Sequence, residues 1–467
     1  MPVAKPSRRL AVVVMAAGKG KRLRSALPKV LHPLAGRPVL RHVLEAARRL
    51  RPWRTVVVVN HGKDQVEEAV RSWGIDAIFV DQGEPLGTGH AVMVAERAVD
   101  RADDVLVLPG DEPLVTAEQL RELMRMHRRR DVAGVLQTTE AAEPRGFGRV
   151  IRNGRDLVRI TEGVEASPEE LAITEVATSV YAFRREDLFK ALPLLSRETK
   201  QKEYYLHHVL PVLLEKGERV AVQQVDNEGA VGANSRSEMA RAAAVLRRRI
   251  NEDLMSSGVT LIEPDRTYVD AGVKIGADTT ILPGVHLEGE TRVGKACTIG
   301  PDSRIVDSRI DDGAEVTYSV VREARVGEGA TVGPYAHLRP GTILGRDTKA
   351  GSFVEIKASK IGDGSKVPHL AYVGDATIGR HVNVGAGTIT CNFDGYEKHR
   401  TVIGDGAFIG SDTMLVAPVR IGRNAVTGAG STITRDVPDG ELAVERSEQR
   451  NVRGYAERRA KRRRGRA

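Results

Sequence analysis

The chain has 467 residues, of which 41% are hydrophobic, and a formal net charge of +9 at pH 7. This length predicts more than one domain, and the hydrophobic content is enough for sizeable cores. The charge does not indicate a nucleic-acid-binding protein, because residues 453–467 alone carry +7 and the body is nearly neutral. We expect this basic tail to be a solvated, disordered end.

Cysteine usage and hydropathy narrow the class of protein further. The cysteines, Cys297 and Cys391, are too few for a disulfide framework. No segment has the pattern of a signal region or of a membrane span. We therefore expect a protein of the reducing cytoplasm.

The N-terminal part alternates predicted strands and helices. Residues 10–15 (LAVVVM) form a continuous apolar run that is typical of a buried parallel strand, and 55–59, 78–80 and 105–108 are predicted strands as well. Residues 63–73 have helical spacing. This alternation predicts an α/β doubly wound sheet, whose ligands bind at the carboxyl ends of the strands.

A glycine-rich segment follows the first predicted strand directly. Residues 16–22 (AAGKGKR) expose backbone N–H groups beside cations that can compensate phosphate charge. The segment lacks the closing Gly-Lys-Ser/Thr of a Walker A loop and the third glycine of the dinucleotide fingerprint. By itself it is a weak indication of phosphate binding. Pro28 and Lys29 follow six residues after Arg22.

Two more turns are predicted at the same edge of the sheet, at residues 82–90 (QGEPLGTGH) and 109–114 (PGDEPL). In the second turn, Asp111 follows a buried strand, where a carboxylate is well placed to hold Mg²⁺ or to cap a helix. Further on, residues 237–257 repeat apolar side chains every three or four positions, between a capping Ser237 and Gly258. We expect a connector helix there and place the domain boundary within it.

From Val273 to Ile433, apolar residues recur every six positions and glycine follows most of them. This period predicts short parallel strands on the flat faces of a left-handed β-helix, with stacked aliphatic side chains as its core. Residues 391–400 (CNFDGYEKHR) interrupt the period, and insertions of this kind are often functional loops. The apolar residues in register are Ile275, Ile281, Leu287, Val293, Ile299, Ile305, Val326, Val332, Leu338, Leu344, Ile403, Ile409, Leu415 and Ile421.

The run MAAGKGKRLRSALPK (residues 15–29) resembles the signature of sugar-phosphate nucleotidyltransferases, and joined to hexapeptide repeats it resembles the bacterial family of bifunctional GlmU enzymes. The resemblance implies acetylation of glucosamine 1-phosphate, followed by uridylyl transfer that gives UDP-N-acetylglucosamine. It also implies Mg²⁺ as cofactor, UTP and acetyl-CoA as co-substrates, and a homotrimer in the bacterial cytoplasm. The implied parts are a uridylyltransferase domain (1–236), a connector helix (237–257), an acetyltransferase β-helix (258–446) and a basic tail (447–467).

For the first domain, the resemblance assigns catalytic cations and metal ligands. Arg22 and Lys29 would stabilise phosphate charge, while Asp111 and Asn234 would hold Mg²⁺. Residues 146–149 (GFGR) match the sugar- and uridine-contacting pattern. The residues implied to contact the nucleotide sugar are Met15, Ala16, Ala17, Gly18, Lys29, Gln82, Gly87, Thr88, Gly148, Glu162 and Asn234.

Two motifs of this domain depart from the family pattern. The pattern Glu-x-Asn-x-Gly is Glu-Val-Ala-Thr-Ser here, with Ala177 in place of the asparagine that would bind the amino sugar and Ser179 in place of the glycine. The Thr-Asp after Glu-Tyr-Tyr-Leu is replaced by His207 and His208. We expect weaker or relaxed sugar selection, because a missing hydrogen bond costs about 1 to 3 kcal/mol.

For the β-helix, the resemblance implies that His369 is the base of acetyl transfer and that Glu355 orients it. A histidine suits this role because it titrates near neutral pH and the attacking amine must lose its proton. Sugar-phosphate contacts are implied at Arg339, Lys357, Tyr372 and Asn383. Acetyl-CoA contacts are implied at Ala386, Asn392, Phe393, Ser411, Ala429 and Arg446, with Phe393 where a tyrosine is frequent.

Two alternatives remain open from the sequence. In one, the first domain accepts a different sugar phosphate or nucleotide, or none, as Ala177 suggests. In the other, the chain is a regulatory or scaffold subunit that binds without catalysing. The intact Asp111, Asn234 and His369 argue against the second alternative.

Overall fold

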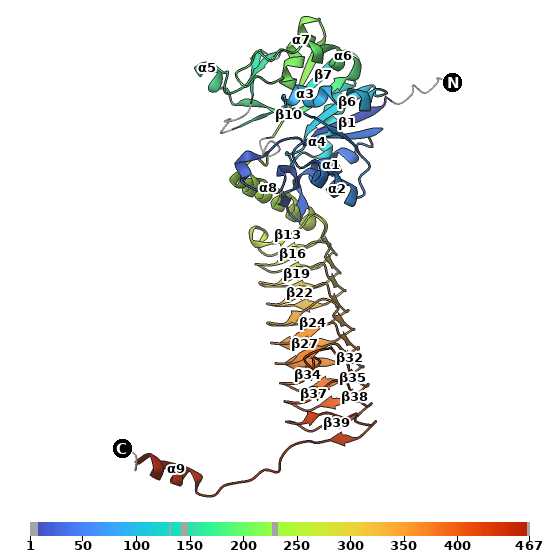
Figure 1. The fold of residues 1–467 in the computed structure, drawn as a ribbon, viewed down its shortest axis with the longest axis vertical. Helices are drawn as coiled ribbons and strands as arrows, with labels where there is room; N and C mark the ends of the chain where they lie inside the picture. Colours follow the sequence, from blue (N-terminus) through green and yellow to red (C-terminus); the bar gives the residue numbers. More distant parts are fainter. Residues whose placement is uncertain (1–7, 130–131, 142–147, 155, 227–231, 465–467) are drawn as a thin grey trace, which may run out of the picture. The chain divides into compact units, whose positions relative to one another are not determined.

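The structure is a computed structural model (Figure 1) that describes residues 8–129, 132–141, 148–154, 156–226 and 232–464. The chain forms two compact units that divide between Arg249 and Ile250. Throughout these ranges, every helix is too short or too polar to cross a lipid bilayer.

A mixed sheet organises the first unit. The strands β1 (Leu10–Met15), β4 (Arg54–Val59), β5 (Ile78–Asp81) and β6 (Asp104–Pro109) run parallel, as predicted. In contrast, β10 (Glu175–Arg184) is antiparallel to both of its neighbours in the sheet, β6 and β7 (Val132–Glu140). A hairpin of β8 (Arg149–Asn153) and β9 (Asp156–Thr161) pairs with β10. The order of the other strands is β11 (Arg219–Val225), β7 (Val132–Glu140), β10 (Glu175–Arg184), β6 (Asp104–Pro109), β1 (Leu10–Met15), β4 (Arg54–Val59) and β5 (Ile78–Asp81).

Successive residues of β1 point to opposite faces of this sheet, so both faces need cover. Ala11 and Val13 belong to one buried cluster, and Val12 and Val14 belong to the other. The first cluster includes side chains of α3 (Thr88–Met93), α6 (Arg185–Ala191) and α7 (Val209–Glu215). The second includes side chains of α1 (Val39–Arg48), α2 (Lys63–Ser72) and α4 (Ala117–His127). Burial on two sides explains why the run LAVVVM is continuously apolar.

The long helix α8 (Arg236–Ser256) contributes to both units. Its first half packs Met239, Ala242 and Leu246 against a small cluster of the first unit. Its last turns place Ile250 and Leu254 on the core of the second unit. Each half of the helix is therefore held by a different core.

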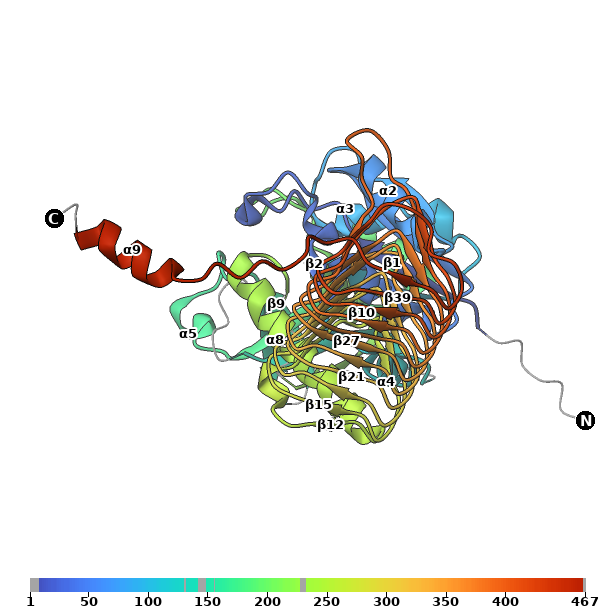
Figure 2. The ribbon, with the colours of Figure 1, turned by 90° about the horizontal axis from the view of Figure 1, so that it is seen from below.

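The second unit is a β-helix of short parallel strands, as the hexapeptide period predicted (Figures 1 and 2). Its first face runs from β12 (Thr260–Leu261) to β41 (Leu442–Ala443), and its second from β13 (Tyr268–Val269) to β40 (Thr432–Ile433). The third face runs from β14 (Lys274–Ile275) to β38 (Val419–Ile421). The in-register aliphatic residues form one buried core, against which Ile275 is only partly buried.

Parallel pairing places equivalent residues of successive coils directly above one another. Lys366 pairs with Asn383 on the first face, and Tyr372 pairs with Ile389 on the second. On the third face, Ala376 pairs with Thr401, because residues 391–400 leave the coil as a loop. The predicted interruption of the period is thus confirmed as an insertion between β34 (Ile389–Cys391) and β35 (Thr401–Ile403).

After the last coil, the basic segment includes a helix, α9 (Tyr455–Arg464). All of its residues are exposed, and it buries no hydrophobic side chain. It therefore has charge but no packing surface.

Leu287→Ala should destabilise the β-helix by about 2 to 5 kcal/mol, because Leu287 is fully buried and stacked between Val269 and Ile305. Denaturant unfolding followed by circular dichroism measures this loss. Glu288→Ala is the matched control, since it removes only an exposed ion pair with Arg304, worth at most about 1 kcal/mol. Equal effects of the two substitutions would contradict the stacked core.

Candidate active sites

Three turns meet at the carboxyl edge of the sheet in the first unit. The N–H of Ala16 donates to Val58 O (2.8 Å), and the N–H of Gly110 donates to Met15 O (2.9 Å). The N–H of Gln82 donates to Val59 O (2.8 Å). The segments after β1, β5 and β6 therefore lie at one edge, as predicted for a ligand site of an open α/β sheet.

Lys29, Asp111 and Asn234 converge at this edge from distant parts of the sequence. The Lys29 Nζ donates to Asp111 Oδ2 and to Asn234 Oδ1. The N–H of Ala233 also donates to Asp111 O (2.8 Å), which fixes the segment that carries Asn234. The Lys29 side chain is 12% exposed and that of Asp111 is 23% exposed. The result is a half-buried cation held between two oxygen groups.

The glycine-rich segment is shaped around the lysine. Gly20 has a φ of +58°, and a Cβ there would lie 2.6 Å from Lys29 Cβ. Both the left-handed backbone and the close approach require glycine. Gly18, by contrast, has open space at its Cβ position. The sequence of this segment thus serves the packing of the Lys29 side chain as well as the exposure of backbone N–H groups.

Glu238 connects Arg22 to the cluster of Lys29, Asp111 and Asn234. The sequence analysis did not predict this role of Glu238. Its Oε2 accepts from the N–H of Asn234 (2.8 Å), and its Oε1 lies 3.9 Å from an Arg22 guanidinium nitrogen. The Arg22 side chain is 65% exposed, so it lies at the rim. The position of Glu238, four residues after Asn234 at the start of a helix, is the signal that could have found it.

Glu112 is a second carboxylate beside Asp111 that the sequence analysis did not assign. It is buried, and burial raises the pKa of its carboxyl well above the usual range, with the negative charge of Asp111 adding to the effect. Burial and the neighbouring charge both favour the neutral, protonated form of Glu112, so this site opposes a second negative charge beside Asp111.

The turn at residues 82–90, which the resemblance assigns to the nucleotide sugar, is hydrogen-bonded to the segment around Tyr204 and Leu206. Gln82 is buried and its Nε2 donates to Gly87 O (3.0 Å). A Cβ at Gly87, whose φ is +106°, would meet Tyr204 O at 2.6 Å. Thr88 Oγ1 accepts from the N–H of Leu206 (3.0 Å), at the start of the 3-10 helix η5 (Leu206–His208). The turn and η5 therefore form one wall.

Gly148, Glu162 and Ala177 lie close to one another in the same unit. The N–H of Ala177 donates to Gly148 O (3.0 Å), and a Cβ at Gly148 would lie 3.6 Å from Glu162 Oε1. Burial raises the pKa of the Glu162 carboxyl, and the neighbouring Glu165 and Glu203 raise it further. Residues 146 and 147 of the predicted GFGR pattern lie outside the described residues.

On the β-helix, charged side chains gather on the second face. Arg339 donates to Glu355 Oε1 (2.7 Å), and Lys357 Nζ lies 3.6 Å from Asp375 Oδ2. Asn392, which is buried, donates to the same Asp375 oxygen. Two phosphate-binding candidates, Arg339 and Lys357, are thus held by carboxylates beside them.

Lys398 reaches this group from the loop 391–400, and sequence reasoning missed it as well. A side-chain hydrogen bond with Lys357, and then the positive charge of Lys357, lower the pKa of Lys398. Two adjacent ammonium groups are unfavourable unless an anion lies between them. Because the loop breaks the hexapeptide period, no repeat position could have revealed this approach.

His369 heads a column of small residues on the corner between the first and second faces. The pairings of Lys366 with Asn383, of Asn383 with Phe408 and of Phe408 with Val426 set the register of successive coils. At an offset of about 4.8 Å per coil, the column spans about 15 Å. Its members are His369, Ala386, Ser411 and Ala429, and Arg446 donates to Ala429 O (2.9 Å) at its end.

Glu355, the predicted partner of His369, is engaged by another residue of the single chain. Within the described ranges, Glu355 makes its ion pair with Arg339, and no hydrogen bond or ion pair joins it to His369. Asn383 lies in β33 (Asn383–Val384) on the first face, whereas Arg339, Lys357 and Tyr372 belong to the second face. The implied acetyltransferase residues thus surround a corner rather than line one pocket.

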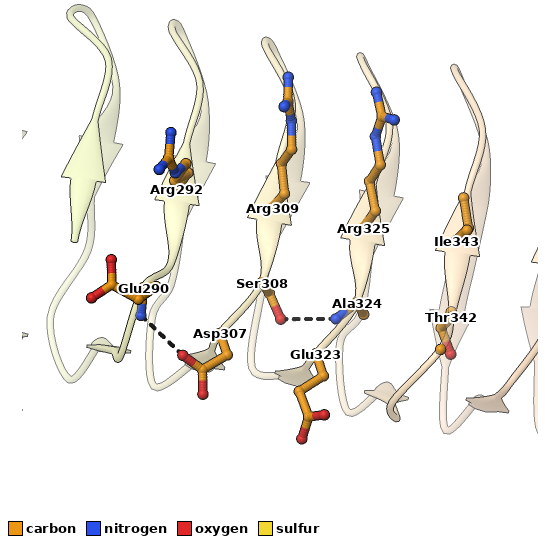
Figure 3. Close-up of a pocket in the computed structure, with 11 residues that line it drawn as sticks. Glu290, Arg292, Asp307, Ser308, Arg309, Glu323, Ala324, Arg325, Thr342 and Ile343 are labelled. Atoms are coloured by element: carbon orange, nitrogen blue, oxygen red, sulfur yellow. Dashed lines mark hydrogen bonds between the residues drawn. The ribbon is translucent and has the colours of Figure 1, made fainter. Parts of the chain in front are cut away.

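A separate hollow on the second unit is lined by two charged rows (Figure 3). Arg292, Arg309 and Arg325 stand on successive coils of the third face, and Arg309 and Arg325 both pair with Asp311 (2.8 and 2.9 Å). The Arg pairs are exposed and none of the implied site residues lines this hollow. Because Asp311 lines a neighbouring hollow and not this one, the arginine row here is an open, solvated charged surface.

A nucleotide-binding α/β unit joined to a hexapeptide β-helix defines a nucleotidyltransferase fused to an acyltransferase-type repeat domain. Residues 12–212 match the MobA-like NTP transferase domain, and residues 400–435 match the bacterial transferase hexapeptide (six repeats). The Bifunctional protein GlmU of Carboxydothermus hydrogenoformans is 47% identical over 445 residues, which is 95% of this chain and 99% of that protein. That of Caldanaerobacter subterraneus subsp. tengcongensis is 45% identical over 453 residues, or 97% and 98% of the two chains. The chain belongs to the bifunctional GlmU family.

Asp394→Ala should loosen the loop 391–400. Its carboxylate accepts from the N–H of Glu397 (2.7 Å) and Tyr396 (2.8 Å) and from His399 Nε2 (2.7 Å), and these bonds hold the pKa of Asp394 well below its usual range. Because this pKa is lowered, the contribution of Asp394 to the loop's order is complete above the ordinary carboxyl pKa and is lost only as the pH falls through the lowered pKa.

At neutral pH, hydrogen exchange of the Glu397 amide should speed up by about fivefold in Asp394→Ala. Glu397→Ala, which alters an exposed side chain of the same loop, should leave exchange at Tyr396 near that of the unaltered chain. Unchanged exchange in Asp394→Ala would show that other contacts hold the loop.

Proposed function

We propose that the chain catalyses two consecutive steps of UDP-N-acetylglucosamine synthesis. The second unit acetylates glucosamine 1-phosphate with acetyl-CoA. The first unit then transfers UMP from UTP to N-acetylglucosamine 1-phosphate and releases pyrophosphate. The observation that carries the proposal, together with the family, is the convergence of Lys29, Asp111 and Asn234 beside the turns of the nucleotide-binding edge.

Mg²⁺ fits this edge. A carboxylate and an amide oxygen already share one positive charge, the Lys29 ammonium, and oxygen ligands of this kind are those that Mg²⁺ prefers. Asp111 and Asn234 would hold the ion, which when bound neutralises phosphate charge. Lys29 and the exposed Arg22 add positive charge for the pyrophosphate leaving group. The sugar phosphate attacks the α-phosphorus in line, so positioning and charge supply most of the catalysis.

The other proposed substrate contacts of the first unit are made by the segments that surround this edge of the sheet. The backbone of residues 15–18 faces the edge where the phosphates bind, and Gln82, Gly87 and Thr88 form the turn that receives the uracil. Gly148 and Glu162 line the region of the sugar.

Asp111→Ala should lower uridylyl transfer by at least about a hundredfold, because it removes a metal ligand and the partner of Lys29. Acetyl transfer should stay near the unaltered rate, since Asp111 belongs to the first unit. Separate assays of the two half-reactions measure both. Asp76→Ala, an exposed aspartate of the same unit, is the control. Equal loss of both activities would indicate misfolding of the variant, whereas unchanged uridylyl transfer would contradict the assignment.

In the second unit, His369 accepts the proton of the substrate amine. The neutral amine nitrogen then bonds to the acetyl carbon and loses a second proton to solvent, the thioester C–S bond breaks, and the coenzyme A sulfur takes the proton from His369 and leaves as its thiol. Arg339, Lys357, Tyr372 and Asn383 hold the sugar phosphate. Lys398 adds a further cation, consistent with its closeness to Lys357.

The column of His369, Ala386, Ser411 and Ala429 offers acetyl-CoA an extended binding surface. Ala386, Ser411 and Ala429 are small and partly or fully exposed, so they leave room along the corner that His369 heads. Asn392, Phe393 and Arg446 complete the contacts. The Phe393 ring is 59% exposed and lacks the hydroxyl that is frequent at this position, so it offers stacking without a hydrogen bond.

We place the enzyme in the bacterial cytoplasm as a homotrimer. An exposed apolar ladder supports assembly, because contiguous exposed apolar side chains mark interaction surfaces. The rings of Tyr318 and Tyr335 are 5.7 Å apart, and those of Tyr335 and Phe353 are 5.3 Å apart. Leu370, 63% exposed, continues the ladder and directly follows His369. Packing through this corner places the base at a subunit interface.

If one acetyltransferase site takes His369 and the loop 391–400 from different chains, inactive variants should complement each other. We expect an equal mixture of His369→Ala chains and Asn392→Ala/Lys398→Ala chains, refolded together, to recover about a quarter of the activity, the share of sites with both parts intact. Each variant alone should be inactive. Uridylyl transfer should be unaffected in all samples. Absent recovery, or an active monomer by light scattering, would contradict the shared site.

A further inference from the structure

His207 is a buried histidine that the reaction described above does not use. Its side chain is 6% exposed, and its Nε2 has no hydrogen-bond partner among the residues that the structure describes. Its ring stacks on Tyr205 at 5.3 Å and meets the edge of His208 at 4.7 Å. Both the position and the direction of the ring are therefore fixed by packing.

Such an unsatisfied nitrogen is unusual, because buried polar atoms of folded proteins nearly always have a partner. Burial lowers the pKa of His207 to about 3, so the imidazole is neutral at physiological pH. A neutral imidazole has one donor and one acceptor nitrogen. The His207 Nδ1 lies 3.6 Å from Glu162 Oε1, and a carboxylate on that side favours the proton on Nδ1. Nε2 is then an acceptor without a donor.

The surroundings of His207 belong to the sugar side of the first unit. Glu162 connects through Gly148 to Ala177, whose methyl group cannot form a hydrogen bond. On the other side, Leu206 is bonded to Thr88 of the base-binding turn. His207 therefore lies between the turn that receives the nucleotide base and the position where alanine replaces the family's asparagine.

We propose that His207 determines sugar selection in this chain, with Nε2 accepting a hydrogen bond from the sugar of the incoming sugar 1-phosphate and so replacing the asparagine amide that Ala177 cannot supply. The donor is an amide N–H or a hydroxyl of the sugar. The inference rests on the proposed uridylyl transfer and names a residue that acts on the sugar alone. Ala177 and His207 are then a compensated pair rather than two independent departures from the family pattern.

The test uses the full chain and N-acetylglucosamine 1-phosphate. His207→Phe keeps a ring against Tyr205 and removes the acceptor, while His207→Gln keeps a polar atom near the place of Nε2. We expect His207→Phe to raise the dissociation constant and the KM of the sugar phosphate by about tenfold and to leave the KM of UTP within about twofold. His207→Gln should recover most of the affinity.

The matched control is His208→Phe, the half-buried neighbour on the same 3-10 helix, which should leave both KM values near those of the unaltered chain. Ala177→Asn added to His207→Phe should restore sugar binding. Calorimetric titration of the sugar phosphate gives the affinity without turnover, and thermal unfolding confirms that each variant folds.

The outcomes separate the two proposals. If the unaltered chain shows no transfer from UTP to any sugar 1-phosphate, the proposed function fails. If it turns over normally and His207→Phe binds the sugar phosphate as tightly, the inference on His207 fails alone. Equal losses for UTP and for the sugar phosphate, with no recovery in His207→Gln, would also overturn it, because they indicate a structural role for the ring.

Discussion

Parallel strand pairing in strict register is the constraint on which both units depend. In the first unit, it brings the ends of β1, β5 and β6 to one edge, so that turns separated by tens of residues share a site. In the second unit, it stacks equivalent residues of successive coils, so that a single position becomes a column. The same backbone geometry thus produces a cluster in one unit and a line in the other, which suits a compact triphosphate and an extended coenzyme respectively.

Charge is arranged differently at the two sites. Lys29 is half-buried between two oxygen groups, so its ammonium is held in place before substrate binds. On the β-helix, Lys357 and Lys398 repel each other and are only partly offset by Asp375. In the proposed function, the first arrangement would receive a cation and phosphates together, and the second would offer its positive charge to a phosphate alone.

The departures from the family pattern lie where the structure concentrates unusual buried groups. Ala177 is buried in the apolar core of the first unit, and Ser179 adopts a φ of +60° in place of glycine. His207 has an unsatisfied nitrogen a short distance from Glu162. In the proposed assignment, the nucleotide and phosphate contacts keep the family's residues, while Ala177 and His207 depart from them on the sugar side. We therefore propose that selection of the sugar and transfer of the nucleotide are separable properties of this unit.

Periodicity by itself determined the β-helix and the position of the first strand, but not the direction of every strand. The hexapeptide spacing fixed the β-helix, its core residues and the excursion at 391–400, and the run LAVVVM located β1, because side-chain period and burial are local properties. The antiparallel direction of β10 was not predicted, since strand direction depends on pairings between distant segments. For the same reason, only the tertiary structure brought Glu238 to Arg22, Lys398 to Lys357 and His207 to Glu162. Motif spacing names the residue types that a site needs, but burial and mutual distance are set by packing between segments far apart in the chain.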